Sequence, residues 1–235
     1  MSDIAAGLTA IQTRMESAAV QAGRDPAAIT LVAVSKTHPA EAVRTALLAG
    51  QRAFGENRVQ EAKAKFPELK AEFPHLELHL IGPLQTNKVR EAVALFDVIE
   101  TIDRPKLART VAEESARAGR HPKVLIQVNM GREPQKAGID PDLVDALVTV
   151  CREQYHLRLE GLMCIPPAEG DPAPHFKALA EMAARNGLAV VSMGMSGDFE
   201  TAIACGATHV RVGSAIFGVR DSSNLRQIEG QIRGE

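Results

Sequence analysis

Short apolar segments rich in β-branched residues recur along the chain, and their pattern predicts strands separated by helices. Eight segments have this character: 29–35, 52–55, 77–82, 98–102, 124–128, 159–165, 190–195 and 209–213. Between them, apolar positions at helical spacing predict helices that include 40–49, 58–65, 106–118, 141–153, 174–186 and 198–205. Eight strands that alternate with helices predict parallel, right-handed βα units closed into a single (β/α)8 TIM-type barrel, of the α/β class.

A doubly wound open sheet is the alternative architecture, because element counts alone do not prove that the sheet closes. No G-x-G-x-x-G turn follows the first strand, which favours the barrel. Residues 1–28 predict an extra N-terminal helix whose apolar face is interrupted by charges, so it does not resemble a signal peptide. We expect one domain over 1–235, with the barrel at 29–220 and a polar C-terminal segment at 221–235.

Charge and cysteine content narrow the class of partner. The 235 residues carry 27 Lys and Arg against 29 Asp and Glu, so no excess charge favours nucleic acid or an anionic membrane. Cys151, Cys164 and Cys205 form no CxxC pair, which fits a reducing compartment. No apolar run approaches the ~20 residues of a membrane span. We expect a cytoplasmic protein with a small-molecule partner.

A lysine follows the first predicted strand directly. In a (β/α)8 barrel the working residues lie at the C-terminal ends of the strands, so Lys36 is predicted at the barrel mouth with apolar residues below it. A lysine desolvated there loses its proton more easily and can attack an aldehyde. The alternative is a lysine that simply extends to solvent at a strand end.

Small-residue turns follow the seventh and eighth strands, where barrels often bind phosphate. Ser196 and Gly197 precede a predicted helix, where backbone N–H groups and a hydroxyl can hold the anion. Gly213 and Ser214 form the second turn. Asp198 is predicted to cap the helix, since a carboxylate would repel phosphate. Alternatively, both turns only connect strand to helix.

Period-two alternation assigns the inward faces of the strands. It directs His209 and Arg211 into the barrel from the eighth strand and His79 from the third. Taken alone, His79 is typical of a satisfied core histidine. Asn57 follows the second strand, and small residues on its face, Ala53 and Gly55, leave space for a ring. Glu56 is interpreted as a solvated loop carboxylate.

A lysine for an aldehyde, amides for a phosphate and an interior arginine together describe a pyridoxal 5'-phosphate (PLP) site. The chain also resembles the YggS/PROSC family of PLP-binding, or PLP homeostasis, proteins, which are similar to the barrel domain of alanine racemase. Six segments between about residues 31 and 220 carry the resemblance: VAVSKT at 32–37, FGENRVQE at 54–61, HLIGPLQTNK at 79–88, GLMCIPP at 161–167, SMGMSGD at 192–198 and RVGSAIFG at 211–218.

The resemblance implies a role for each residue of the site. Lys36 forms a Schiff base with the cofactor, Asn57 lies near the ring and Arg211 faces the pyridine nitrogen. The phosphate is bound by Ser196, Gly197, Gly213 and Ser214. No metal is implied, and the variable charged loop at 131–136 receives no role.

Three functions compete at this stage. The first is a carrier that holds PLP for homeostasis without evident catalysis, as a monomer, with apo-PLP enzymes as possible recipients. The second is an alanine-racemase-like enzyme, which needs a second acid/base; Tyr155 is the single tyrosine and precedes the sixth strand at the wrong end of the barrel. The third is a cofactor-free aldolase-like barrel with Lys36 as its Schiff-base lysine. It would lack an obvious acid/base pair, since Cys164 and Asn129 are more typical of structural residues.

Overall fold

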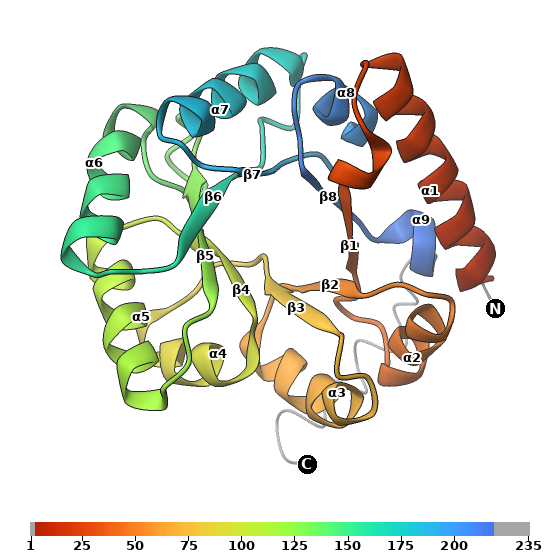
Figure 1. Ribbon diagram of the computed structural model, residues 1–235, viewed down its shortest axis with the longest axis horizontal. Helices are drawn as coiled ribbons and strands as arrows, with labels where there is room; N and C mark the ends of the chain where they lie inside the picture. Colours follow the sequence, from red (N-terminus) through yellow and green to blue (C-terminus); the bar gives the residue numbers. More distant parts are fainter. Residues whose placement is uncertain (1–2, 219–235) are drawn as a thin grey trace.

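The computed structural model describes residues 3–218, and its centre is a closed barrel of eight parallel strands in chain order (Figure 1). The strands are β1 (Thr30–Val34), β2 (Ala53–Glu56), β3 (Glu77–Leu80), β4 (Val98–Ile102), β5 (Lys123–Val128), β6 (Leu159–Cys164), β7 (Val190–Ser192) and β8 (His209–Val212). Four residue pairs join β8 to β1, from Thr30 with His209 to Ala33 with Val212. The barrel predicted from the sequence is therefore confirmed over the open sheet.

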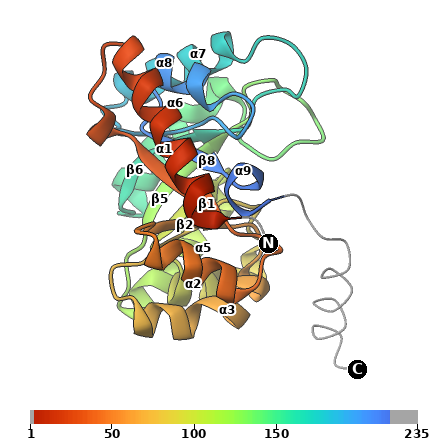
Figure 2. The ribbon, with the colours of Figure 1, turned by 90° about the vertical axis from the view of Figure 1, so that its right-hand side faces the viewer.

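Helices surround the barrel on its outside (Figures 1 and 2). They are α1 (Ile4–Gln21), α2 (Ala40–Leu48), α3 (Val59–Glu72), α4 (Val89–Leu95), α5 (Pro105–Ala118), α6 (Val144–Thr149), α7 (Ala173–Arg185), α8 (Phe199–Ala204) and α9 (Ser214–Phe217). The main apolar core lies between this ring and the strands, where alternate strand residues such as Leu31 and Ala33 are buried. The sheet alternation thus leaves the other strand face for the barrel interior.

The predicted N-terminal helix is present as α1. Asp3 caps it by accepting a hydrogen bond from the Ala6 amide at 3.1 Å. Its apolar stripe is buried in the core: Ile4, Leu8, Ile11 and Met15. In Figure 1 the helix lies beside α8, α9 and α2, outside the junction of β8 and β1. The helix therefore covers the seam where the barrel closes.

Two helical features differ from the sequence prediction. The helix predicted at 58–65 continues through Pro67 to Glu72, because Phe66 and Leu69 are fully buried and their packing offsets the lost proline N–H. The helix predicted at 141–153 is present as three successive segments: a 3-10 turn (Pro141–Leu143), α6 and a π-helical turn (Val150–Gln154). The polar segment predicted at 221–235 lies outside the described residues.

Inward-facing residues lie where alternation predicted them. The rings of His79 on β3 and His209 on β8 are 6.0 Å apart across the barrel interior. A Cβ on Gly55 of β2 would come within 3.0 Å of Ile81 and 3.2 Å of Val32. The small residue thus leaves room between neighbouring strands just below the barrel mouth.

Candidate functional site

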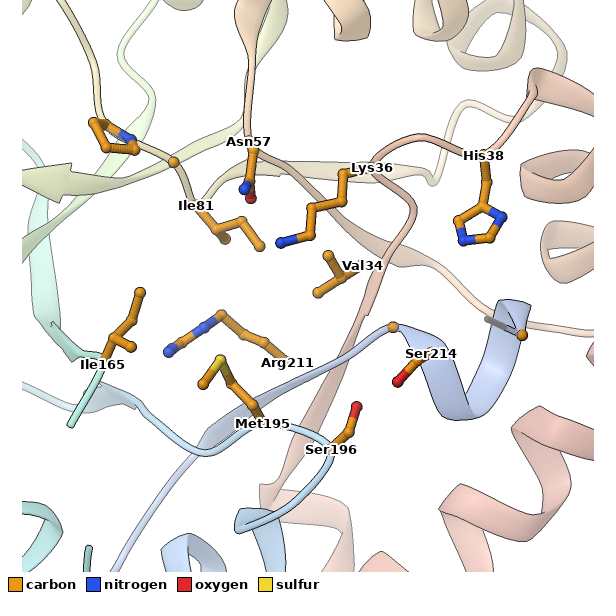
Figure 3. A pocket seen from close by; sticks show the side chains of 14 residues that line it. Val34, Lys36, His38, Asn57, Ile81, Ile165, Met195, Ser196, Arg211 and Ser214 are labelled. Atoms are coloured by element: carbon orange, nitrogen blue, oxygen red, sulfur yellow. The ribbon is translucent and has the colours of Figure 1, made fainter. Parts of the chain in front are cut away.

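A cavity of about 290 Å³ opens at the C-terminal ends of the strands (Figure 3). Its walls come from the ends of β1, β2, β3, β6, β7 and β8 and from the turns that follow them. The lining residues are Val34, Lys36, His38, Asn57, Ile81, Gly82, Pro83, Ile165, Met195, Ser196, Arg211, Gly213, Ser214 and Gly218. This is the end of a (β/α)8 barrel at which ligands bind.

Six of the seven residues predicted for the site line this cavity. Gly197 is the exception: it lies in the turn between Ser196 and α8 but is not among the lining residues. Figure 3 shows the Lys36 side chain directed into the space between Asn57 and Arg211. Ser196 and Ser214 lie on the opposite side from Asn57. The structure therefore brings the predicted amine, arginine and serine turns to one cavity.

Two glycines allow the backbone segments around the cavity to approach closely. A Cβ on Gly82 would lie 2.1 Å from the carbonyl oxygen of Asn57, which no side chain could tolerate. A Cβ on Gly213 would lie 3.0 Å from the carbonyl oxygen of Val34. These contacts place Asn57 against the loop after β3 and bring the turn after β8 against the end of β1.

Arg211 is held by a chain of buried hydrogen bonds inside the barrel. Its guanidinium donates to the Ser192 hydroxyl at 2.7 Å and to the Cys164 carbonyl at 2.8 Å. Ser192 donates to Glu100 Oε2 at 2.6 Å, and His79 Nδ1 lies 2.6 Å from Glu100 Oε1. We call His79, Glu100, Ser192 and Arg211 the arginine-side cluster. All four side chains are almost fully buried, so the arginine has a fixed direction.

The charges within the arginine-side cluster stabilise one another. Burial alone would lower the pKa of His79, but its hydrogen bonds to Glu100 and Glu77 raise it above the usual value. Burial would raise the pKa of Glu100, but the hydrogen bond and charge of His79 and the charge of Arg211 lower it. His79 is thus a buried, hydrogen-bonded core histidine, as interpreted from the sequence, and the carboxylates at both of its ring nitrogens favour its charged form.

Glu56 is not the solvated loop carboxylate that the sequence suggested. Its side chain is fully buried, accepts a hydrogen bond from the Ser35 hydroxyl at 2.7 Å, and lies 2.7 Å from the ammonium of Lys65. Lys65 also pairs with Glu61 at 2.9 Å. We call Ser35, Glu56, Glu61 and Lys65 the lysine-side cluster. Sequence reasoning missed it because Lys65 reaches back under the β1 turn from α3, a tertiary contact without a local signal.

Burial shifts the protonation of Glu56 towards neutrality. Burial and the neighbouring charge of Glu61 raise the pKa of Glu56, while Lys65 and the Ser35 hydroxyl lower it, and the result is a pKa of about 7. The carboxyl group is therefore partly protonated near neutral pH.

Asp198 precedes α8 as predicted, but its side chain does not cap the helix. Its carboxylate accepts a hydrogen bond from the backbone amide of Met195 at 2.6 Å. The aspartate thus closes the turn that carries Ser196, and it does not satisfy the first amides of the helix. The cap prediction is wrong in this detail, because the carboxylate bonds to the turn amide in place of the helix amides.

Comparison with known proteins identifies the family to which this barrel and its cavity belong. The family model for the alanine racemase N-terminal domain matches residues 8–221. Two curated relatives named pyridoxal phosphate homeostasis protein are each 44% identical. The one from Pseudomonas aeruginosa aligns over 94% of this chain and 97% of its own length, and the one from Escherichia coli K12 over 95% and 99%. The chain belongs to the alanine racemase N-terminal domain family.

A solved structure of a relative supports the same membership. PipY of Synechococcus elongatus PCC7942, solved with PLP bound, superposes with a TM-score of 0.80 and 38% identity, covering 92% of this chain and all of that chain. At this coverage and identity, the relative has the same fold over nearly all of the chain.

Within this family frame, the residues considered for other chemistry have structural roles. Burial raises the pKa of the Cys164 thiol to about 12, and the Asn129 amide bonds to the backbone of Glu133. Tyr155 lies before β6, at the end of the barrel opposite the cavity. Among residues 3–218 no cluster of His, Cys, Asp and Glu could hold a metal. No helix in the same range is long and apolar enough to cross a bilayer.

Eight lining residues were given no role from the sequence. They are Val34, His38, Ile81, Gly82, Pro83, Ile165, Met195 and Gly218. Most lie inside the segments that carried the family resemblance, so the sequence marked these positions but assigned them no function. His38 lies just outside these segments, and its ring stacks on Phe217 at 5.1 Å between centroids, a contact between the β1 turn and α9.

Proposed function

We propose that this chain binds PLP covalently through Lys36 and serves PLP homeostasis, holding the cofactor as a Schiff base without catalytic turnover. One observation carries the proposal: a single cavity at the barrel mouth receives a lysine amine, an arginine and two serine turns. Curated relatives named for PLP homeostasis and the PLP-bound PipY structure support it.

The donor groups of the cavity match the parts of PLP. The hydroxyls of Ser196 and Ser214, with the amides of Gly197 and Gly213, would hold the phosphate, since neutral donors at a helix start suit an anion. Asn57 would lie beside the ring. The cavity, about 290 Å³, is at the lower end of the ~300–1,000 Å³ typical of ligand pockets, a size that suits one small cofactor.

When bound, PLP supplies an aldehyde, which condenses with the Lys36 amine to form a C=N bond and release one water. Arg211 would direct its guanidinium at the pyridine nitrogen. A guanidinium only donates hydrogen bonds, so the nitrogen facing it must act as an acceptor and stay unprotonated. An unprotonated ring withdraws electrons weakly, so it would stabilise a carbanion on a bound amino acid less than a protonated ring would.

Racemisation would need an acid/base on the ring face opposite the lysine. Tyr155 lies at the other end of the barrel, and among the described residues no tyrosine lines the cavity. Both facts support a carrier over a racemase. We further propose that the protein is a single-domain monomer of the cytoplasm that supplies PLP to apo-PLP enzymes. Its three unpaired cysteines fit a reducing compartment.

The test is spectroscopic and chemical. Purified protein mixed with PLP should become yellow, and borohydride should fix the cofactor on the peptide that contains Lys36. Lys36→Ala should abolish both signals. A reduced adduct on Lys88 or Lys136 in place of Lys36 would contradict the site assignment.

Turnover is measured separately, with L-alanine in deuterated water. Exchange of the α-proton near the rate given by free PLP is expected. Exchange at ~1 per second or faster would identify an enzyme and refute the carrier function.

A further inference from the structure

The turn that carries Lys36 has an unfavourable backbone. Thr37, the next residue, has a φ of 67°, in the left-handed region that β-branched residues rarely adopt. Such a conformation is strained and persists only where the surroundings hold it. The contacts that hold this turn are therefore expected to determine the direction of Lys36.

One buried ammonium bonds to the turn on both sides of Lys36. Lys65 of α3 donates to the carbonyl oxygen of Ser35 at 2.9 Å and to that of His38 at 3.1 Å. Its side chain is only 10% exposed. Because the two carbonyls flank Lys36, a single cation fixes the start and the end of the turn.

The two carboxylates of the lysine-side cluster complete these attachments. Glu61 accepts a hydrogen bond from the strained Thr37 amide as well as from Lys65. Glu56 accepts from the Ser35 hydroxyl, and its Oε1 lies 2.7 Å from the Lys65 ammonium, whose three N–H groups are shared among the four surrounding oxygens. Ser35, Thr37 and His38, which flank Lys36, are thus each bonded directly to Lys65 or to a carboxylate that Lys65 pairs with.

We propose that Lys65 is a positioning residue: it fixes the 35–38 turn and so sets the approach of the Lys36 amine to the cavity. The inference rests on the proposed function, since it concerns how that lysine is presented. Lys65 does not line the cavity, so it acts through the turn. Removing it should slow covalent loading of PLP and leave the binding of ring and phosphate intact.

The experiment compares Lys65→Met with Lys63→Met. Lys63 is on the same helix, is half exposed and pairs with Glu91, away from the turn. Three quantities are measured: the rate of C=N formation after mixing with PLP, the affinity for pyridoxine 5'-phosphate, which lacks the aldehyde, and hydrogen exchange of the 35–38 peptide without ligand. For Lys65→Met we expect loading at least tenfold slower, faster exchange and an affinity within twofold of wild type. Lys63→Met should match wild type in all three.

A second variant protects the test against misfolding. Lys65→Met leaves Glu56 buried without its cation, so the substitution is also made together with Glu56→Gln, which removes the charge, and compared with Glu56→Gln alone. The double variant should again load at least tenfold more slowly than its reference.

The outcomes separate the two proposals. A wild-type protein that forms no adduct on Lys36 refutes the proposed function. A wild-type adduct with unchanged loading and exchange in the Lys65 variants refutes the positioning role. Equal losses in loading and in pyridoxine 5'-phosphate affinity also refute it, because they would indicate a general effect on the fold.

Discussion

The lysine-side and arginine-side clusters each bury one carboxylate completely, yet the two carboxylates differ in protonation. Glu100 lies between two cations: it bonds to His79 and is 4.0 Å from Arg211. Although burial opposes ionisation, these charges lower its pKa. Glu56 shares the single ammonium of Lys65 with a second carboxylate, and burial raises its pKa to about 7. The ratio of cations to carboxylates, more than depth, determines which group stays charged.

The two clusters also support different parts of the cavity. The arginine-side cluster crosses the barrel interior from β3 through β4 and β7 to β8. The lysine-side cluster joins α3 to the turn after β1. The arginine-side cluster holds the Arg211 side chain, which lines the cavity. The lysine-side cluster holds the backbone of the turn that carries Lys36. We therefore expect removal of a charge to reduce stability most in the arginine-side cluster, and a change of pH to affect stability through the lysine-side cluster.

The largest expected effect comes from matched substitutions of the two carboxylates. Glu100→Gln removes the buried carboxylate between His79 and Arg211 and leaves His79 only Glu77 as a partner, so it should lower the free energy of unfolding at pH 7 by about 3–5 kcal/mol. Glu56→Gln removes a carboxylate that is already partly protonated, so it should cost about 1 kcal/mol or less. Urea denaturation of both variants measures the difference. Equal costs would show that the two clusters do not differ as described.

The next effect is a dependence of stability on pH. The folded pKa of Glu56 is about 7 and its ordinary value is 4.5, so its contribution to stability is complete below pH 4.5 and is lost as pH rises to about 7. The loss corresponds to on the order of 3 kcal/mol. Glu56→Gln has no carboxyl group to ionise, so it avoids this loss. As pH rises from 4.5 to about 7, the unfolding free energy of wild type should therefore fall relative to that of the variant. Parallel pH profiles would contradict the raised pKa.

These clusters also show what could be predicted from the sequence. The strands, the barrel and six of the cavity residues followed from the apolar pattern, the strand-end rule and the family resemblance, all of which are local signals. The buried residues that hold the site residues in place could not be predicted in this way. Ser192 and Glu100 are far apart in the chain and meet only through the barrel interior, and Glu56 looks like a loop residue until α3 covers it.

A third, smaller effect on the free energy of unfolding is expected when either of two buried serines is replaced. Ser192 donates to Glu100 and accepts from Arg211, so Ser192→Ala breaks two bonds to charged groups and should cost about 2 kcal/mol. Ser35 donates to Glu56, which is partly protonated, so Ser35→Ala should cost about 1 kcal/mol. Both side chains are fully buried, which makes them matched controls. A greater loss in Ser35→Ala would reverse the ranking of the two clusters.

The smallest expected effect concerns a residue that belongs to neither cluster. Ser196 lines the cavity in the turn after β7, where we propose that its hydroxyl binds the phosphate. Ser196→Ala should raise the dissociation constant for PLP about tenfold, which corresponds to one charge-assisted hydrogen bond of ~1.5 kcal/mol. Its free energy of unfolding should stay within about 0.5 kcal/mol of wild type, because the side chain lies at a loop surface.

Pyridoxal, which has the aldehyde but no phosphate, provides the control for Ser196→Ala. Wild type should bind it weakly, and the substitution should leave that weak affinity unchanged, because the lost hydroxyl has no phosphate to contact. Titration of both proteins with both ligands, followed by absorbance, gives the four dissociation constants. If wild type binds pyridoxal as tightly as PLP, the turns after β7 and β8 do not bind phosphate. In that case the retention of the cofactor depends only on the parts of the cavity that the two buried clusters hold in place.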